Sequence, residues 1–196
     1  MNEDGVDDTR ERILAATTAS VESSGVRGFS LEQVAATAGV SRTTVYRYFP
    51  GGRTQLVSET VTWEIGRFWR RLASAVEDLA TLEDRLVAGL VVGRKLIDRS
   101  TIMSNLMDPD LEELLAAAQP SEPLVHGVVR DYIRETLESE AGAGNLREGL
   151  DLDAVADYLM RMTVSWLGSP TGVDLTDPEA TRKVVRRQFL AGVVRS

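Results

Sequence analysis

The chain has 196 residues, of which 43% are hydrophobic, and carries a formal net charge of −8 from 22 basic and 30 acidic side chains. This length supports a sizeable core in one domain, or in a small domain joined to a larger one. The absence of cysteine excludes disulfides, thiolate metal sites and cysteine nucleophiles, and His126 is the only histidine. We therefore expect no enzyme, no catalytic residue, no metal site and no cofactor. An acidic cluster converging in a cleft would reopen the enzyme alternative.

The N-terminal residues are acidic and polar, and no apolar run approaches the roughly 20 residues that a membrane span needs. We expect neither a signal peptide nor a spanning helix, and hence a cytoplasmic protein with no membrane partner. Residues 1–8 are predicted to form a disordered acidic tail.

Helix signals dominate from Thr9 onward. A first helix is predicted from Thr9, as N-cap, to Ser23, with Gly25 as the stop. Ser30 and Gln33 match a capping box that opens a second, short helix ending at Gly39. The apolar face of this second helix consists of Leu31, Val34, Ala35 and Ala38.

A third helix is predicted to begin after Ser41 as its N-cap and to end before Pro50-Gly51-Gly52. Val45 and Phe49 share its apolar side, whereas hydroxyls, tyrosines and arginines cover the rest. Two short helices joined by a turn that contains glycine form a helix-turn-helix, whose second helix enters the major groove of DNA. Residues 39–56 contain three arginines and no carboxylate, which suits a polyanion. The alternative, an ordinary solvated basic face, remains open on charge alone.

In these residues the chain resembles the TetR family of transcriptional regulators. The resemblance covers about residues 9–60 and rests on Ile13, Ala16 and Gly25, the segment SLEQVAATAGVSRTTVYRYF, and Leu56. It implies DNA contacts by Ser41, Thr43, Thr44, Tyr46 and Tyr48, to which the residue chemistry adds Arg42 and Arg47. Many family members have a lysine three residues after the phenylalanine. Here Gly52 takes that position and Arg53 follows, so Arg53 is the candidate for that contact.

The remaining sequence predicts further helices, separated by well-marked ends. Their ranges are Thr54–Leu79, Leu82–Asp98, about Pro109–Ala117, about Pro123–Glu140, Asp153–Leu167 and Pro178–Val194. The predicted fold class is all-α. An N-terminal three-helix DNA-binding domain over residues 9–53 is joined to a helical ligand-binding and dimerisation domain over residues 54–196.

The resemblance further implies an effector cavity and a homodimer interface in this second domain. Large or adaptable apolar side chains are the candidates for the cavity: Phe68, Trp69, Ile97, Met103, Leu106, Met107, Tyr132 and Met160. The apolar faces of the last two helices are the candidates for the interface: Leu152, Val155, Leu159, Trp166, Val185, Phe189 and Val193.

Together these features predict a repressor that binds double-stranded operator DNA of palindromic sequence as a homodimer. A small apolar or amphipathic effector would release it. The alternative is a ligand-independent DNA-binding dimer, which a collapsed interior would favour and a continuous apolar cavity would oppose.

Overall fold

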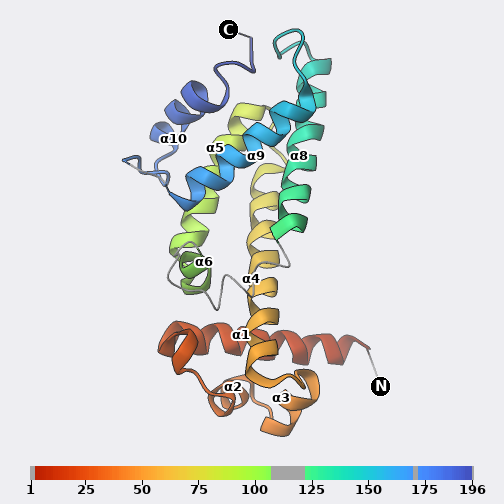
Figure 1. Cartoon of the computed structure of the whole chain (residues 1–196), viewed down its shortest axis with the longest axis vertical. Helices are drawn as coiled ribbons and strands as arrows, with labels where there is room; N and C mark the ends of the chain where they lie inside the picture. The colour runs from red at the N-terminus through yellow and green to blue at the C-terminus, as the bar shows by residue number, and fades with distance from the viewer. Residues whose placement is uncertain (1–2, 107–121, 170–171, 196) are drawn as a thin grey trace. The chain divides into compact units, whose positions relative to one another are not determined.

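The computed structural model describes residues 3–106, 122–169 and 172–195, and the regular structure in these residues is helical apart from one isolated bridge (Figure 1). The predicted all-α fold class is confirmed. The helices are α1 (Glu3–Gly28), α2 (Leu31–Ala38), α3 (Arg42–Tyr48), α4 (Gly52–Val76), α5 (Leu82–Asp98), α6 (Thr101–Leu106), α8 (Glu122–Gly142), α9 (Leu152–Gly168) and α10 (Pro178–Val184), followed by the π-helical turn η2 (Val185–Phe189).

The chain divides into two compact units, each made of two segments. The first consists of Met1–Arg67 with Asp98–Pro120, and the second of Phe68–Ile97 with Ser121–Ser196. The sequence instead predicts a boundary between residues 53 and 54. The difference arises because α4 contributes residues to both units, and because Ile102 of α6 is buried in the core of the first.

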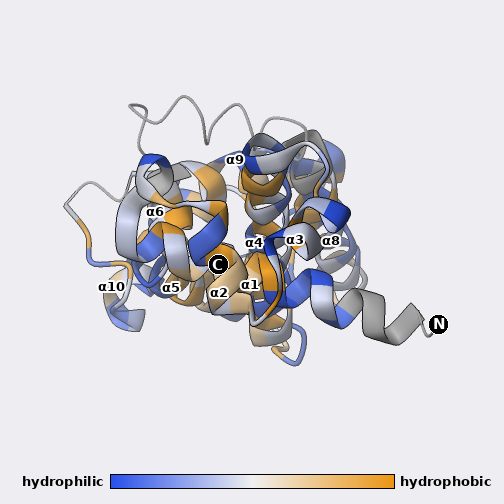
Figure 2. Ribbon diagram, turned by 90° about the horizontal axis from the view of Figure 1, so that it is seen from below, coloured by the Kyte–Doolittle hydropathy of each residue, from blue (hydrophilic) through white to orange (hydrophobic). Residues whose placement is uncertain are grey.

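The first unit is built on a core between α1, α2, α3 and the N-terminal part of α4. Along α1 a hydrophilic stretch is followed by a hydrophobic one (Figure 2), where Ile13 and Leu14 are fully buried. The backbone leaves the helical conformation at Gly25 (φ 73°), which confirms the predicted stop. At its other end α1 extends back to Glu3, across most of the predicted tail.

The second helix has the ends that its sequence predicts. Ser30 Oγ accepts from the backbone of Gln33, and Gln33 Oε1 accepts from the backbone of Ser30, at 3.2 and 2.8 Å, so the capping box is confirmed. Gly39 closes the helix in the left-handed conformation (φ 65°), where its N–H bonds back to the last turn. A residue with a Cβ would be strained at this φ, which explains the glycine.

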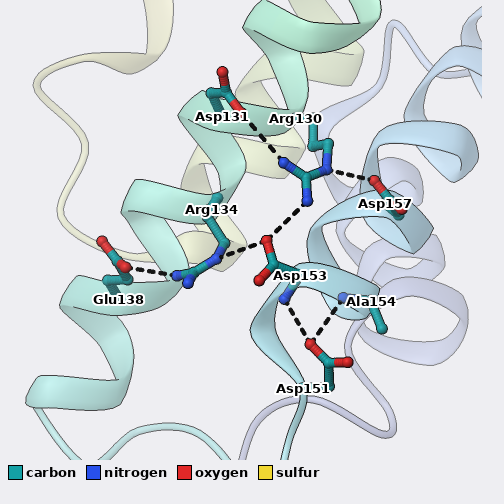
Figure 3. Close-up of polar contacts among 8 residues, drawn as sticks. All are labelled: Arg130, Asp131, Arg134, Glu138, Asp151, Asp153, Ala154 and Asp157. Atoms are coloured by element: carbon teal, nitrogen blue, oxygen red, sulfur yellow. Dashed lines mark hydrogen bonds and ion pairs between the residues drawn. The ribbon is translucent and has the colours of Figure 1, made fainter.

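In the second unit, α8 and α9 pack side by side and are joined by charged groups (Figure 3). Arg130 of α8 donates to Asp157 at 2.6 Å and to Asp153 at 2.8 Å, both on α9. Arg134, one turn along α8, donates to Asp153 at 3.2 Å and to Glu138 at 2.6 Å. These bonds hold the pKa of Asp153 below its ordinary value, first through Arg134 and then through Arg130.

The predicted helices of the second unit are confirmed except at the last one. Asp151 and Asp177 cap α9 and α10, and Pro178 opens α10. The helix predicted to reach Val194 ends instead at η2. There the wider turn, with Leu190 N bonded to Val185 O, is followed by pairing of Arg147 N with Val193 O. The helix predicted at about Pro109–Ala117 lies outside the described residues.

Within the described ranges, no helix combines the length and the apolar character that crossing a bilayer requires.

Candidate nucleic-acid interface and effector cavity

The short helix α3 of the α2–turn–α3 segment is buried on one side and exposed on the other. Ser41 Oγ accepts from Thr44 N at 3.0 Å and caps α3. Val45 and Phe49 are fully buried in the core of the first unit, so they fix the rotation of α3 about its axis. The other side of α3 is left for a ligand.

The structure places most of the predicted DNA-binding side chains on this outer surface. Ser41, Arg42, Thr43, Tyr46 and Arg47 are exposed, whereas Thr44, Tyr48 and Arg53 are half-buried. Tyr46 is 40% exposed, which is unusual for a large aromatic side chain in this protein. Tyr48 is partly buried instead and packs against the core of the first unit.

The two arginines of α3 differ in their electrostatic surroundings. Arg42 forms an ion pair with Glu32 of α2 and lies 5.5 Å from the centre of the Tyr46 ring. The pKa of Arg42 is raised above its ordinary value, first by the hydrogen bond to Tyr46 and then by the charge of Glu32. Arg47 lies over the Tyr48 ring at 5.2 Å and has no carboxylate partner among the described residues. Arg47 is therefore the cation that a phosphate can reach without displacing an acid.

The turn after α3 explains the departure from the family pattern. Gly52 has φ 64°, and its N–H donates to Phe49 O at 2.9 Å. A lysine in this left-handed conformation would be strained. Arg53, the next residue, has its guanidinium 4.7 Å from the centre of the Phe29 ring.

A series of polar contacts joins this turn to α1, and these contacts were not predicted from the sequence. Gln55 accepts from Gly51 N and donates to Glu59 Oε1, both at 2.7 Å, and Glu59 forms an ion pair with Arg10 of α1. The i, i+4 spacing of Gln55 and Glu59 on one helix was the available signal. Their partner on α1 could not be identified from local sequence.

The second unit contains a cavity of about 150 Å³ between α4, α5, α8 and α9. Most of the lining is aliphatic, and Arg85, Tyr132, Thr136 and Thr163 contribute the main polar groups. The lining residues are Trp69, Leu72, Ala73, Val76, Leu82, Arg85, Leu86, Gly89, Val128, Val129, Tyr132, Ile133, Thr136 and Thr163. Two of the lining residues, Ala73 and Val128, are exposed.

Of the side chains predicted to bind a ligand, the structure brings Trp69 and Tyr132 together at this cavity. Phe68, Ile97 and Met160 are buried in the second unit but do not line it, and Met103 is buried in the first unit. The Leu106 side chain and Met107 lie outside the described residues.

The residues predicted to form the dimer interface fall into two groups. Leu159, Val185, Phe189 and Val193 are buried within the single chain. Leu152, Val155 and Trp166 of α9 are half-buried. Tyr158, also on α9, is 41% exposed and donates to Gln188 O. Of the predicted interface residues, the accessible ones are thus on α9 rather than in η2 or the residues after it.

The capped pair α2 and α3, with an exposed basic and hydroxyl-bearing second helix, is a helix-turn-helix of the kind that binds DNA in the major groove. Residues 13–60 match the family model described as bacterial regulatory proteins, tetR family. In these residues the chain is therefore similar to the regulators that this family model describes.

Relatives and solved structures extend this result. The transcriptional regulator LmrA of Bacillus subtilis is 39% identical over 54 residues, which is 28% of this chain and 29% of LmrA. The aligned segments span less than half the length of the curated relatives.

Solved structures share the fold over nearly the whole chain. A TetR regulator from Chloroflexus aurantiacus is 19% identical with a TM-score of 0.64, covering 97% of this chain and 98% of its own. The regulator FadR of Bacillus subtilis, solved in complex with stearoyl-CoA, is 16% identical with a TM-score of 0.60, covering 89% and 96%.

Proposed function

We propose that the protein is a ligand-responsive transcriptional repressor that binds a palindromic operator as a homodimer. A small apolar or amphipathic effector releases it. The observation that carries this proposal is the course of α4. This helix begins at Gly52, directly after the recognition helix, and its Trp69, Leu72 and Val76 line the cavity.

Such a helix couples two binding events if the positions it adopts with and without effector differ. An effector that prefers the DNA-incompetent form shifts the equilibrium by the ratio of its affinities for the two forms. Operator DNA must then weaken effector binding by the same factor. A coupling of about 1–3 kcal/mol is typical of such systems.

Dimerisation follows from the size of the recognition element. The seven residues of α3 reach only a few base pairs. Two copies related by a two-fold axis would read a palindrome with half-sites about one helical turn apart, or a multiple of it. The half-buried Leu152, Val155 and Trp166 supply apolar surface for such an interface.

The alternative, a ligand-independent DNA-binding dimer, is disfavoured by the cavity, because a purely structural interior would be packed without such a space. The stearoyl-CoA bound by FadR also supports an effector.

Selection of duplexes from a random pool by the purified full chain tests the proposal, with light scattering to measure its molar mass. Enrichment of a two-fold symmetric sequence by a dimer is the expected result. Enrichment of an asymmetric single site by a monomer would contradict it.

A further inference from the structure

An apolar and a polar pocket meet at three shared residues in the second unit. The apolar cavity and a neighbouring pocket of about 120 Å³ are both lined by Arg85 of α5 and by Tyr132 and Thr136 of α8. The polar pocket adds Glu135, Ser139 and Glu140 among its lining residues. These three shared side chains therefore lie at the border between an apolar and a polar surface, where the polar head of an amphipathic molecule would meet its apolar body.

Arg85 is held by neutral partners. Its Nε donates to Leu79 O at 2.7 Å, and Nη1 donates to Tyr132 Oη at 3.1 Å and to Thr136 Oγ1 at 3.2 Å. Among the described residues no carboxylate lies within ion-pair distance of this guanidinium, and Nη2 has no hydrogen bond. In contrast, Arg130 and Arg182 of the same unit each contact two or more carboxylates. A half-buried cation that forms no ion pair is costly, and an anionic ligand in contact with it would relieve that cost.

The nearby acids determine from which side an anion can arrive. Glu140 is buried, and its two oxygens accept from Leu82 N and Asn145 Nδ2, both at 2.7 Å. Glu135 is exposed and also lines the polar pocket. Both carboxylates would repel an anion in the polar pocket. Among the described residues that line the apolar cavity there is no acid, so this side is the one from which an anionic head would reach Arg85.

The volume of the cavity limits the rest of the molecule. An apolar cavity of about 150 Å³ accommodates a group of the size of benzene. We propose that the cavity binds a small monocarboxylate with an apolar body of about this size, and that its carboxylate pairs with Arg85. Tyr132 and Thr136 hold the guanidinium in place. This inference rests on the proposed function, in which the cavity is the effector site.

The probes are phenylacetate and its neutral isostere phenylacetamide, titrated by calorimetry into the full-length protein. We expect phenylacetate to bind at least about tenfold more tightly, because hydrogen bonds to charged groups are the strong ones. Arg85→Gln should abolish this preference, while Arg85→Lys should retain part of it. Arg71→Gln is the matched control, since Arg71 is an exposed arginine of α4 in the same unit and is absent from the cavity lining.

A second variant keeps Arg85 and removes the space. A Cβ on Gly89 would have Val76 Cγ1 as its nearest neighbour, at 4.0 Å, so Gly89→Leu should fold with its side chain in the cavity. Loss of phenylacetate binding in this variant is the expected result. Equal affinity for acid and amide, or unchanged binding by Arg85→Gln or Gly89→Leu, would overturn the carboxylate site, as would the absence of binding by either probe. Binding with the expected preference but without any change in operator affinity would instead contradict the effector role, leaving the site intact.

Discussion

Arg42 of α3 forms an ion pair with Glu32 of α2, the preceding helix. In the proposed complex with DNA, this acid of the same motif would compete with the phosphates for the arginine. Both side chains are more than half exposed, at 57% and 59%. The pair therefore contributes little to stability. Its main consequence is for DNA binding.

Replacing the acid should strengthen DNA binding. Glu32→Gln removes the competitor and a negative charge beside the phosphates, so we expect operator affinity to rise by up to about fivefold. The salt dependence should become steeper by about one unit of slope. Fluorescence anisotropy at several salt concentrations measures both quantities. Unchanged or weaker binding by this variant would show that Arg42 does not approach the DNA.

The unpaired arginine of α3 should matter more than the paired one. Arg47→Ala is expected to weaken operator binding by about 1–3 kcal/mol if Arg47 contacts a base, with relaxed specificity at that position. A phosphate contact, such as that expected of Tyr46, weakens all sequences about equally. Arg71→Ala, in the second unit, is the control. Operator affinity of Arg47→Ala that stays at the wild-type value would remove Arg47 from the interface.

The glycine after α3 should be required for stability. Gly52→Ala places a Cβ on a residue with φ 64° and is expected to lower the free energy of unfolding by about 1–2 kcal/mol. Gly52→Asn should lower it less, since asparagine tolerates this conformation better. Urea unfolding of both variants provides the comparison. If Gly52→Ala left the free energy of unfolding unchanged, the positive φ of residue 52 would not explain why glycine stands where many family members have lysine.

Acid should weaken the contact between α5 and α10. The pKa of Glu83 is lowered, first by its hydrogen bond from Arg186 and further by Arg182, and the pKa of Asp84 is lowered, first by Thr81 and then by Arg182. Because the unfolded chain binds protons more readily, this stabilisation is complete above about pH 5 and is lost as the pH falls through the folded pKa values.

The size of the acid effect is limited by exposure of these groups. We expect this contact to contribute about 0.5–1 kcal/mol to the difference between the free energies of unfolding at neutral and at acid pH. Arg182→Gln should reduce this difference, as measured by urea unfolding at pH 7 and pH 3. An equal difference in wild type and variant would rule out this contact as the source.

Local features of the fold could be predicted from sequence, and long-range ones could not. The capping box at Ser30 and Gln33 and the cap at Asp177 involve neighbouring residues, so their side chains identify them directly. After the last helix ends, Val193 O accepts a hydrogen bond from Arg147 N. No short window of sequence contains both residues.

The candidate sites follow the same division. The exposed face of α3 was predictable because Val45 and Phe49 fix which side is buried. The cavity was predictable only in part, since residue size indicated Trp69 and Tyr132 but not Gly89, which lines the cavity through its lack of a side chain. In the sequence, nothing near Arg85 distinguishes it from other arginines on helices. Its neutral partners Tyr132 and Thr136 come from a helix about 50 residues later in the chain.

The most direct test of the regulatory account is equilibrium binding of the purified full chain to the DNA flanking its own gene. A scrambled duplex of equal length is the control, and both are measured at two salt concentrations. We expect saturable, salt-sensitive binding with a preference of at least about a thousandfold for a palindrome in that DNA. Equally weak binding to both duplexes would contradict it.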